Sequence, residues 1–281
     1  MKYLFLVLAF YSSSLIAQSS LRFNKRFVQC EDKWVAYQRD KDSTYTYGFI
    51  YIDSQAGLTY QNKGRFKITD DNTFVSVKDA LDTISLKVRL QPNNVKVAII
   101  PDDKLKELQL PEFPDWLQYY KTDTGTIERL FRWGYLYNSW DECDIALPYL
   151  ERGYKMNPDF KGLAFELAYA YNALDKCDKA ITVLETALAT HPNECYMYKE
   201  LSYAQIHTGQ LDKAAITCKK GIGLCTDKSM KAEIAINLAQ GYYKLKDKTN
   251  FKYWAKETRK WATKGDDYTS SINKMEADMD K

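Results

Sequence analysis

The sequence contains very little histidine, and its charge favours neither sign. Only His191 and His207 occur in 281 residues, so metal-hydrolase sites and Ser-His-Asp triads lack their usual parts. The 40 Lys and Arg side chains are balanced by 37 Asp and Glu, and both signs are spread evenly along the chain. Because neither half of the chain carries a large excess of positive charge, we do not expect nucleic acid as a partner.

Motifs that mark catalysis or bound groups are also missing. The sequence contains no phosphate-binding loop and none of the patterns GxSxG, HExxH, CxxC or zinc deaminase. The paired carboxylates Asp70–Asp71 and Asp102–Asp103 lie beside turn residues, which is typical of turns and helix caps. A hydrolase before His191 would need a carboxylate-only mechanism. We therefore predict a non-enzymatic protein without cofactor or metal, with a secreted hydrolase as an alternative.

The chain has one apolar run of note, at its N-terminus. A lysine at position 2 is followed by apolar residues 3–11, then by serines and the small residue Ala17. This order is typical of a secretory signal peptide over residues 1–18, cleaved after Ala17 or Gln18. The run is shorter than the ~20 residues of a spanning helix, which disfavours a membrane anchor. We expect an exported protein, periplasmic or secreted, that does not span a membrane.

Residues 19–101 have the composition of a small antiparallel β domain. In the run from Thr44 to Ile52 the odd positions are aromatic and the even positions mostly small or aliphatic, which is the period of a strand. Similar runs are predicted at 58–68, 74–77, 84–90 and 95–100. Residues 102–126 contain short helical stretches at 102–110 and 115–120 between prolines, and we expect a linker there.

Beyond residue 126 the sequence repeats itself at a fixed step of 34 residues, which is the separation of Pro158 and Pro192. Tyr137 and Tyr171 are separated by the same step, and Ala146 recurs at Ala180 and Ala214. These residues resemble the tetratricopeptide repeat (TPR), in which two antiparallel helices form each unit. The resemblance implies units at 127–160, 161–194, 195–228 and 232–263, followed by a C-terminal tail at 264–281. The fold class we expect is α+β and multi-domain, a small antiparallel β domain followed by an all-α solenoid of about four hairpins.

The resemblance also implies a binding groove. In such repeats the first helices line the concave face, and repeat positions 2, 5, 9, 12 and 13 point into it. The rings and amides at these positions suit an extended peptide, and we predict a partner-binding groove there; core packing of the same rings is the alternative. The predicted groove residues are Phe131, Tyr135, Asn138, Phe165, Tyr169, Asn172 and Tyr203.

Six cysteines follow the predicted signal peptide. In the repeat register Cys195 and Cys225 come at the same end of the third hairpin, which implies a disulfide between them. Cys143 and Cys177 occupy equivalent positions of stacked repeats, where a larger separation disfavours a bridge. A zinc site of His191, Cys195, Cys218 and Cys225 matches no standard spacing.

The segment from Lys244 to Lys264 contains eight basic and two acidic residues, with Trp254 and Trp261 on one helix face. We interpret it as a terminal cap that covers the end of the array, with a membrane-surface helix as the alternative.

The predicted function is a protein–protein interaction scaffold of the cell envelope that binds a polypeptide in the groove. Besides a hydrolase, the alternative is a glycan- or envelope-binding module presenting Tyr45, Tyr47, Tyr51 and Tyr60 of the β domain. The oligomeric state stays open.

Overall fold

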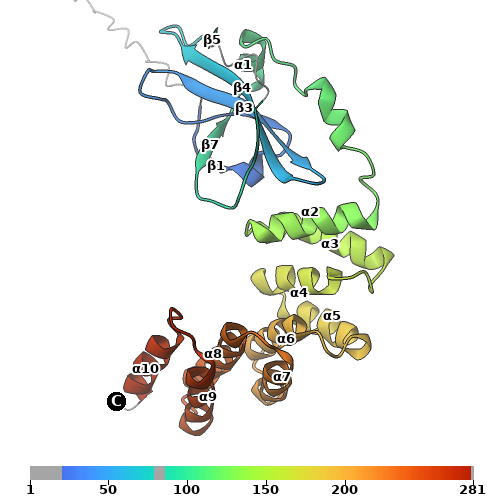
Figure 1. Cartoon of the computed structure of the whole chain (residues 1–281), viewed down its shortest axis with the longest axis vertical. Coiled ribbons are helices and arrows are strands. Elements are labelled where there is room, and N and C mark those ends of the chain that lie inside the picture. The colour runs from blue at the N-terminus through green and yellow to red at the C-terminus, as the bar shows by residue number, and fades with distance from the viewer. Residues whose placement is uncertain (1–20, 79–85, 280–281) are drawn as a thin grey trace, which may run out of the picture. The chain divides into compact units, whose positions relative to one another are not determined.

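The structure is a computed structural model that describes residues 21–78 and 86–279. The predicted signal peptide, residues 1–18, lies outside the described residues. The chain divides into two compact units, one ending at Thr122 and one beginning at Asp123. Figure 1 shows strands in the first unit and helices in the second. This is the expected α+β architecture, and each unit is described by itself below.

The first unit, which we call the β unit, is built on one antiparallel sheet. Over residues 21–78 and 86–122, seven strands pair in the order β1-β7-β2-β3-β4-β5, with β6 also paired to β4. Each predicted run contains a strand, the run at 84–90 being described from residue 86 onward, and β1 and β2 are additional. The strands are β1 (Lys25–Arg26), β2 (Lys33–Ala36), β3 (Tyr45–Asp53), β4 (Gly57–Ile68), β5 (Phe74–Val77), β6 (Lys87–Arg89) and β7 (Lys96–Ile99).

Strand β3 is buried on both of its faces. Its aromatic residues Tyr47, Phe49 and Tyr51 belong to one core cluster, while Ile50 on the alternate face is also fully buried. Gly48 is required where the pairing of β3 with β4 shifts register, because a Cβ there would meet the carbonyl oxygen of Gln61 at 2.2 Å. A central strand covered on both sides explains why this part of the sequence is apolar at successive positions.

The segment expected to be a linker is part of the β unit's core. Helix α1 (Asp102–Glu107) contributes Leu105, and the 3-10 helix η3 (Asp115–Tyr120) contributes Leu117. The Trp116 ring lies 4.9 Å from that of Tyr51, and Trp34 Nε1 donates a 2.8 Å hydrogen bond to the Pro111 carbonyl. The short helices were predicted. However, the segment that contains them packs against the sheet, and it is not a separate linker.

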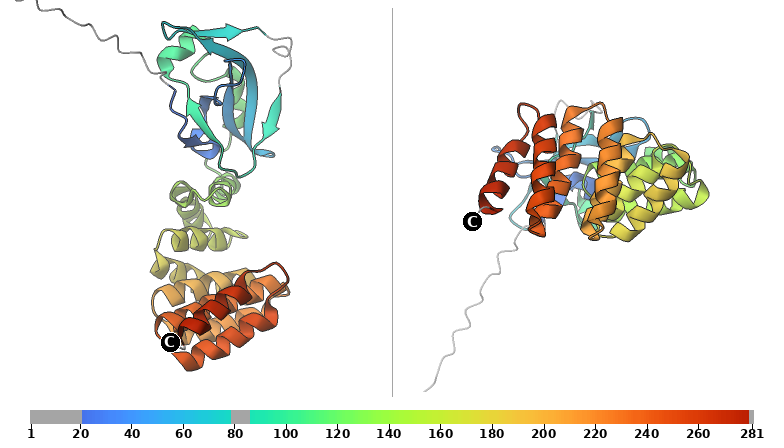
Figure 2. Two further views of the ribbon diagram at one scale, coloured as in Figure 1. Left: turned by 90° about the vertical axis from the view of Figure 1, so that its left-hand side faces the viewer. Right: turned by 90° about the horizontal axis from the view of Figure 1, so that it is seen from below.

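The second unit, which we call the helical array, begins with four helical hairpins. Figure 2 shows them stacked one after another. Between residues 123 and 261 of the described chain, the helices fall where the repeat step predicts them. The hairpins are α2 (Ile127–Ser139) with α3 (Cys143–Met156), α4 (Leu163–Ala173) with α5 (Cys177–Thr190), α6 (Cys195–His207) with α7 (Leu211–Leu224), and α8 (Lys228–Lys244) with α9 (Lys248–Trp261).

Small residues allow the two helices of a hairpin to approach each other. A Cβ added at Gly134 of α2 would lie 2.4 Å from the Leu150 side chain of α3. Ala146, Ala180 and Ala214, one in each of the first three hairpins, have no exposed surface. These are positions at which the repeat pattern demands small side chains, so the sequence signal reports a packing constraint.

The fourth hairpin ends the repeats and is covered by a further helix. The bulky Phe251 replaces the small residue of the pattern and is 1% exposed, packed 6.0 Å from the ring of Tyr243. Residues 264–281 were expected to be a tail, but they contain α10 (Tyr268–Met279), which packs on α8 and α9. Its Ile272 is fully buried, and Arg259 of α9 binds Glu276 and Asn273 on it.

Candidate partner-binding face of the helical array

The first helices of the hairpins line the inner face of the array. Helix α2 contacts α4, α4 contacts α6 and α6 contacts α8, whereas within the described residues the second helices α3, α5 and α7 make no comparable contacts with one another. A stack whose first helices are closer together than its second helices curves toward the first helices. Side chains on the free stripe of α2, α4 and α6 therefore form one continuous face, which we call the inner face.

A pocket lies beside the aromatic residues of repeat position 5, and Phe165 is one of its lining residues. Phe131 packs 5.4 Å from the ring of Phe160, and Phe165 meets Tyr196 edge-on at 6.1 Å. Tyr196 remains 54% exposed. The pocket has a volume of about 580 Å³ and lies where α4 and α6 begin and α5 ends. It is lined by Pro158, Asp159, Phe160, Lys161, Gly162, Ala164, Phe165, Ala187, His191, Glu194, Tyr196 and Met197.

The chemistry of this pocket is that of an apolar recognition site. Its volume lies within the roughly 300–1,000 Å³ of ligand sites, and aromatic and aliphatic groups dominate its walls. The charged residues of the lining are Lys161, Asp159 and Glu194, and the remaining lining residues are mostly apolar. Such a pocket suits an uncharged, bulky side chain better than an ion.

The three tyrosines at repeat position 9 differ in exposure. Tyr135 is 54% exposed, while Tyr169 and Tyr203 are half-buried. Burial raises the pKa of Tyr169 and of Tyr203, and neighbouring cysteine and carboxylate groups raise it further. The ring of Tyr203 stacks on His207 with centroids 4.1 Å apart. The phenols of Tyr169 and Tyr203 are thus neutral at physiological pH and able to donate hydrogen bonds.

Asn138 and Asn172 do not point into the groove, contrary to the prediction. They are 3% and 4% exposed. Asn138 Nδ2 donates to the carbonyl oxygen of Glu166 at 3.0 Å and to its carboxylate at 2.8 Å, and Asn172 repeats both bonds with Glu200 at 3.1 and 2.9 Å. Repeat position 12 lies at the seam between consecutive first helices, where an amide satisfies a buried carboxylate.

The sequence did not lead us to expect a role for the two glutamates on the other side of this seam. Glu166 is 8% exposed and Glu200 4%. Burial raises the pKa of Glu166, and the Asn138 hydrogen bond partly offsets the effect. The signal was available, since the two glutamates are separated by the repeat step and each follows its asparagine by 28 positions.

Phe160 and Tyr196 were also missed, although both line the pocket. Phe160 lies in the connection between the first two hairpins, outside the helices to which the groove pattern applies. Tyr196 occupies position 2 of the third unit and could have been found from the same register as Phe165. Of the predicted residues, Phe165 lines the pocket, and Phe131 packs on the lining residue Phe160. Tyr135 is exposed and Tyr169 and Tyr203 are half-buried, and their part in a groove stays a prediction.

The disulfide Cys195–Cys225 is present, with Cα atoms 5.2 Å apart. It joins the start of α6 to the residue after α7, and Cys195 lies between the pocket residues Glu194 and Tyr196. Both sulfurs are therefore engaged with each other and not with a metal. No group of three or more metal-binding side chains occurs in residues 21–78 and 86–279.

The tyrosines proposed as a glycan platform lie mostly in the core of the β unit. Tyr47, Tyr51 and Tyr60 are at most 5% exposed. Tyr45 is half-buried and stacks 5.2 Å from Phe66. The buried rings of Tyr47, Tyr51 and Tyr60 present no binding platform, because they pack within the β unit.

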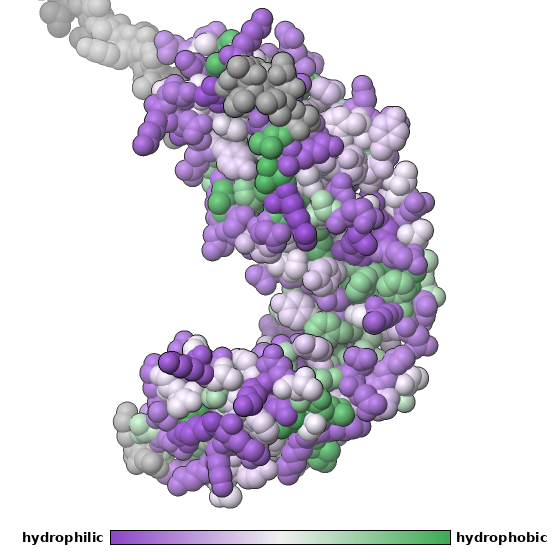
Figure 3. Space-filling view, viewed as in Figure 1, coloured by the Kyte–Doolittle hydropathy of each residue, from purple (hydrophilic) through white to green (hydrophobic). Residues whose placement is uncertain are grey.

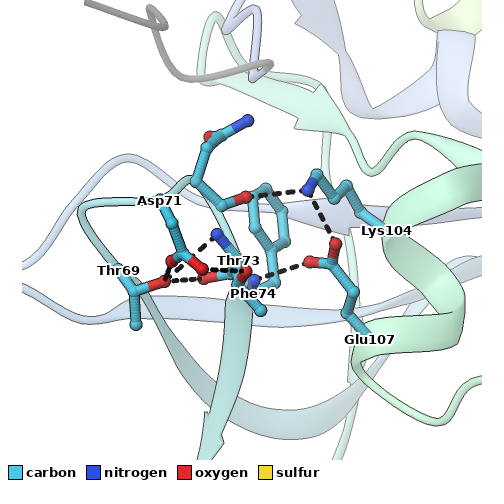
Figure 4. Close-up of polar contacts among 7 residues, drawn as sticks. Thr69, Asp71, Thr73, Phe74, Lys104 and Glu107 are labelled. Carbon is cyan, nitrogen blue, oxygen red and sulfur yellow. Dashed lines mark hydrogen bonds and ion pairs between the residues drawn. The ribbon is translucent and has the colours of Figure 1, made fainter.

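Asp71, one of the paired carboxylates of the β unit, makes contacts within a turn (Figure 4). Asp71 accepts hydrogen bonds from Thr69 and Thr73 in the turn between β4 and β5, and these bonds lower the pKa of the carboxyl. Asp102 and Asp103 occupy the first turn of α1. Glu107 of that helix accepts 2.7 Å and 2.6 Å bonds from Lys104 Nζ and the Phe74 amide, which tie α1 to β5. These contacts stabilise local structure.

The basic segment before residue 264 forms helix α9, and its tryptophan face is covered. Trp254 is 2% exposed in the core beneath α10. Trp261 is half-buried, with Lys231 Nζ 4.2 Å from its ring centroid. Among the described residues, no helix is both long and apolar enough for a membrane span. This arrangement matches the cap interpretation of the segment.

Proteins similar to this chain are found among solved structures. No family model matches it, and no curated protein matches it either. MamA AMB-1 is 21% identical over 51% of this chain and 76% of that chain, with a TM-score of 0.43. TTC0263, a thermophilic TPR protein in Thermus thermophilus, is 18% identical over 63% and 90%, with a TM-score of 0.46. Because these similarities are distant, the TPR-like fold of the array rests on its own four hairpins and their repeat step.

Proposed function

We propose that the helical array is a non-enzymatic protein–protein interaction scaffold that binds a partner polypeptide along its inner face. The observation that carries the proposal is the pocket of about 580 Å³ walled by Phe160, Phe165 and Tyr196. An aromatic ring that is 54% exposed at the mouth of an apolar pocket, as Tyr196 is, has contact area to bury against a partner.

The partner chain would cross the first helices in an extended form. One of its bulky apolar side chains would enter the pocket, and its neighbours would cover Tyr135 and Tyr169 on α2 and α4. On the face visible in Figure 3, the apolar residues of the array form small patches among polar ones. This favours binding through a local anchor and not through a broad apolar contact. In such interfaces a few buried aromatic contacts carry most of the binding free energy.

An envelope location is part of the proposal. It is supported by the signal-peptide pattern of residues 1–18 and by the Cys195–Cys225 disulfide, since disulfides persist in oxidising compartments. Cell fractionation and the intact mass of the mature protein test it. A mature chain beginning at Gln18 or Ser19 outside the cytoplasm is expected; full-length protein in the cytosol would contradict export.

Affinity capture with matched variants tests the scaffold. The full mature chain, Tyr196→Ala and Ile216→Ala are immobilised and exposed to an envelope extract. Ile216 on α7 is 72% exposed and outside the pocket, so its variant controls for the loss of any exposed apolar group. A protein retained by the wild type and by Ile216→Ala, but lost with Tyr196→Ala, supports the proposal. A protein that both variants retain as well as the wild type does would contradict the proposal. So would retention of glycan or lipid without any protein.

A further inference from the structure

The outer helices of the array differ in charge between the first two and the last two hairpins. The second helix of each hairpin lies away from the inner face. In the first two hairpins these helices, α3 and α5, contain three basic and four acidic side chains. In the last two hairpins, α7 and α9 contain eight basic and two acidic side chains. Positive charge is therefore concentrated on the outer side of the last two hairpins.

Helix α9 uses one face as a cap and exposes lysines on another. Phe251, Trp254 and Ala255 are buried in the core beneath α10. Residues four apart lie on the same side of a helix. The exposed lysines of α9 follow one another at that spacing, at Lys248, Lys252, Lys256 and Lys260. The cap formed by the tryptophan face thus leaves a stripe of lysines turned to solvent.

Helix α7 extends this positive surface. It buries Ala214 and Cys218 and exposes Lys213 and Lys219. Lys219 Nζ lies 5.6 Å from the ring centroid of Tyr253 on α9, so the two helices are neighbours there. Figure 1 shows α7 and α9 on the same side of the last two hairpins. The surface that they share, which we call the basic outer face, carries Lys213, Lys219, Lys252, Lys256 and Lys260.

The charge of the basic outer face is largely unopposed within the protein. Of its five lysines, only Lys260 makes an ion pair with a residue that the structure describes, with its Nζ 3.5 Å from Glu257. The other carboxylate of the two helices is the exposed Asp212 of α7. The remaining ammonium groups are available to an external negative charge.

The available cations are lysines, whereas the arginine of α9 is already engaged. Arg259 binds Glu276 and Asn273 of α10. Glu276 also borders the cleft that Lys252 lines, so its charge is offset by Arg259 before it reaches the lysines. An arginine forms bidentate contacts with one defined carboxylate or phosphate, whereas a lysine is a flexible, hydrated point charge. A group of lysines therefore suits a diffuse negative surface.

Exposed apolar groups lie among these lysines. Ile216 of α7 is 72% exposed, and it lies three residues from both Lys213 and Lys219. Tyr253 of α9 is 49% exposed and lies three residues before Lys256. Aliphatic and tyrosine side chains flanked by lysines are typical of surfaces that rest on the headgroup region of a bilayer.

From this charge and exposure we propose that the basic outer face binds the surface of an anionic lipid bilayer. Its ammonium groups attract the lipid phosphates, and Ile216 and Tyr253 enter the headgroup region. A bilayer is favoured over an acidic polypeptide because the charge is spread over two helices with apolar groups between the lysines. The inner face is carried by the first helices, so it stays free for a partner, and the inference stands apart from the proposed function.

Vesicle flotation with the full mature chain tests the inference. One set of vesicles contains phosphatidylglycerol and phosphatidylcholine in equal parts, and the other contains phosphatidylcholine alone. We expect at least about tenfold tighter binding to the anionic vesicles, and loss of that preference at an ionic strength of about 0.5 M, because salt screens charges at a surface. Equal binding to both sets, or no binding to either at low ionic strength, would overturn the proposal.

Matched triple variants separate position from net charge. The first replaces three lysines of the basic outer face, with Lys219→Gln, Lys252→Gln and Lys256→Gln. The control replaces three exposed lysines of the first two hairpins, with Lys155→Gln, Lys176→Gln and Lys179→Gln. We expect the first variant to weaken binding to anionic vesicles at least about tenfold and the control less than about twofold. Melting temperatures verify that both variants keep their fold; equal losses of binding would refute a specific face.

A soluble polyanion tests the acidic-polypeptide alternative. At equal concentrations of negative charge, the chain should bind anionic vesicles more tightly than poly-glutamate, because only a bilayer takes up Ile216 and Tyr253. Equal or tighter binding to poly-glutamate would mean that the face recognises an acidic polypeptide, and the bilayer proposal would be wrong. The Tyr196→Ala variant should bind vesicles as the wild type does, so the result does not depend on the scaffold proposal.

Discussion

Tyrosine serves two different purposes in the two units of this chain. In the β unit, Tyr47 and Tyr51 of β3 are at most 4% exposed and help to form the core. In the helical array, Tyr135 is 54% exposed, and Tyr169 and Tyr203 keep part of their surface accessible. A central strand is covered on both faces, whereas a first helix packs on its own partner and its two neighbours and leaves one stripe free. Position in the layer, and not residue type, decides which aromatic groups are available to a partner.

The sharpest test of this comparison pairs one tyrosine from each unit. Tyr51→Ala should destabilise the β unit by about 3–5 kcal/mol, because it empties a site packed against Trp116 and Tyr120. Tyr135→Ala should change the stability of the array by less than about 0.5 kcal/mol. Denaturation of the full chain, followed by hydrogen exchange in peptides of each unit, measures both. The control is Tyr51→Phe, which keeps the ring; equal losses in Tyr51→Ala and Tyr135→Ala would contradict the comparison.

The Cys195–Cys225 disulfide should contribute nearly as much to the stability of the helical array. Cys225→Ser opens a loop of 30 residues and should cost about 3–4 kcal/mol, chiefly by freeing the unfolded chain. The loss should be confined to the helical array, since the β unit holds no part of this bond. Urea unfolding with and without a dithiol reductant measures it. The double variant with Cys195→Ser should match the single one and respond to no reductant; an equally stable reduced wild type would contradict the prediction.

Much of this fold could be predicted from periodicity alone. The period of two in β3 and the repeat step of the hairpins each reflect a packing rule that recurs along the chain. The role of η3 could not be read in this way, because Trp116 packs on Tyr51 from 65 positions away and no local pattern records that contact. Likewise α10 follows the last repeat, so the repeat step gives no signal for it.

The site was predicted in part, and its errors have one physical cause. Phe165 lines a pocket and Tyr135 is exposed, and their role in a partner-binding groove stays a prediction. The asparagines at position 12 lie on the same helices but at the seam with the next repeat, where the buried Glu166 and Glu200 take up the amides. The repeat pattern predicts the direction in which each side chain points. It does not predict which residue of the next repeat will lie opposite that side chain.

The hydrogen bonds at this seam should stabilise the array. Asn172→Ala should destabilise the array by about 1–3 kcal/mol, because it leaves the carboxylate of Glu200 buried without that hydrogen-bond donor. Asn193→Ala, at an exposed position in the connection before α6, should have no measurable effect. Thermal unfolding followed by far-ultraviolet circular dichroism compares the two. An Asn172→Ala protein with unchanged stability and weakened partner binding would restore the groove role that the sequence suggested.

The smallest effect concerns the pH dependence of the same seam. Burial raises the pKa of Glu166 above the value of an unfolded glutamate, near 4.5. The folded state thus binds the proton more tightly than the unfolded chain, so this residue favours folding below that value and loses its contribution as the pH rises through the raised pKa. Glu166→Gln cannot ionise, and its amide oxygen can still accept from Asn138. Its stability relative to the wild type should therefore increase between pH 4 and pH 8, by a small amount because the Asn138 bond opposes the effect of burial. Urea midpoints at matched ionic strength measure this trend, with the exposed Glu185→Gln as a control that should show no trend. A variant whose relative stability falls with rising pH would mean that Glu166 is stabilised in its charged form, contrary to the effect of burial.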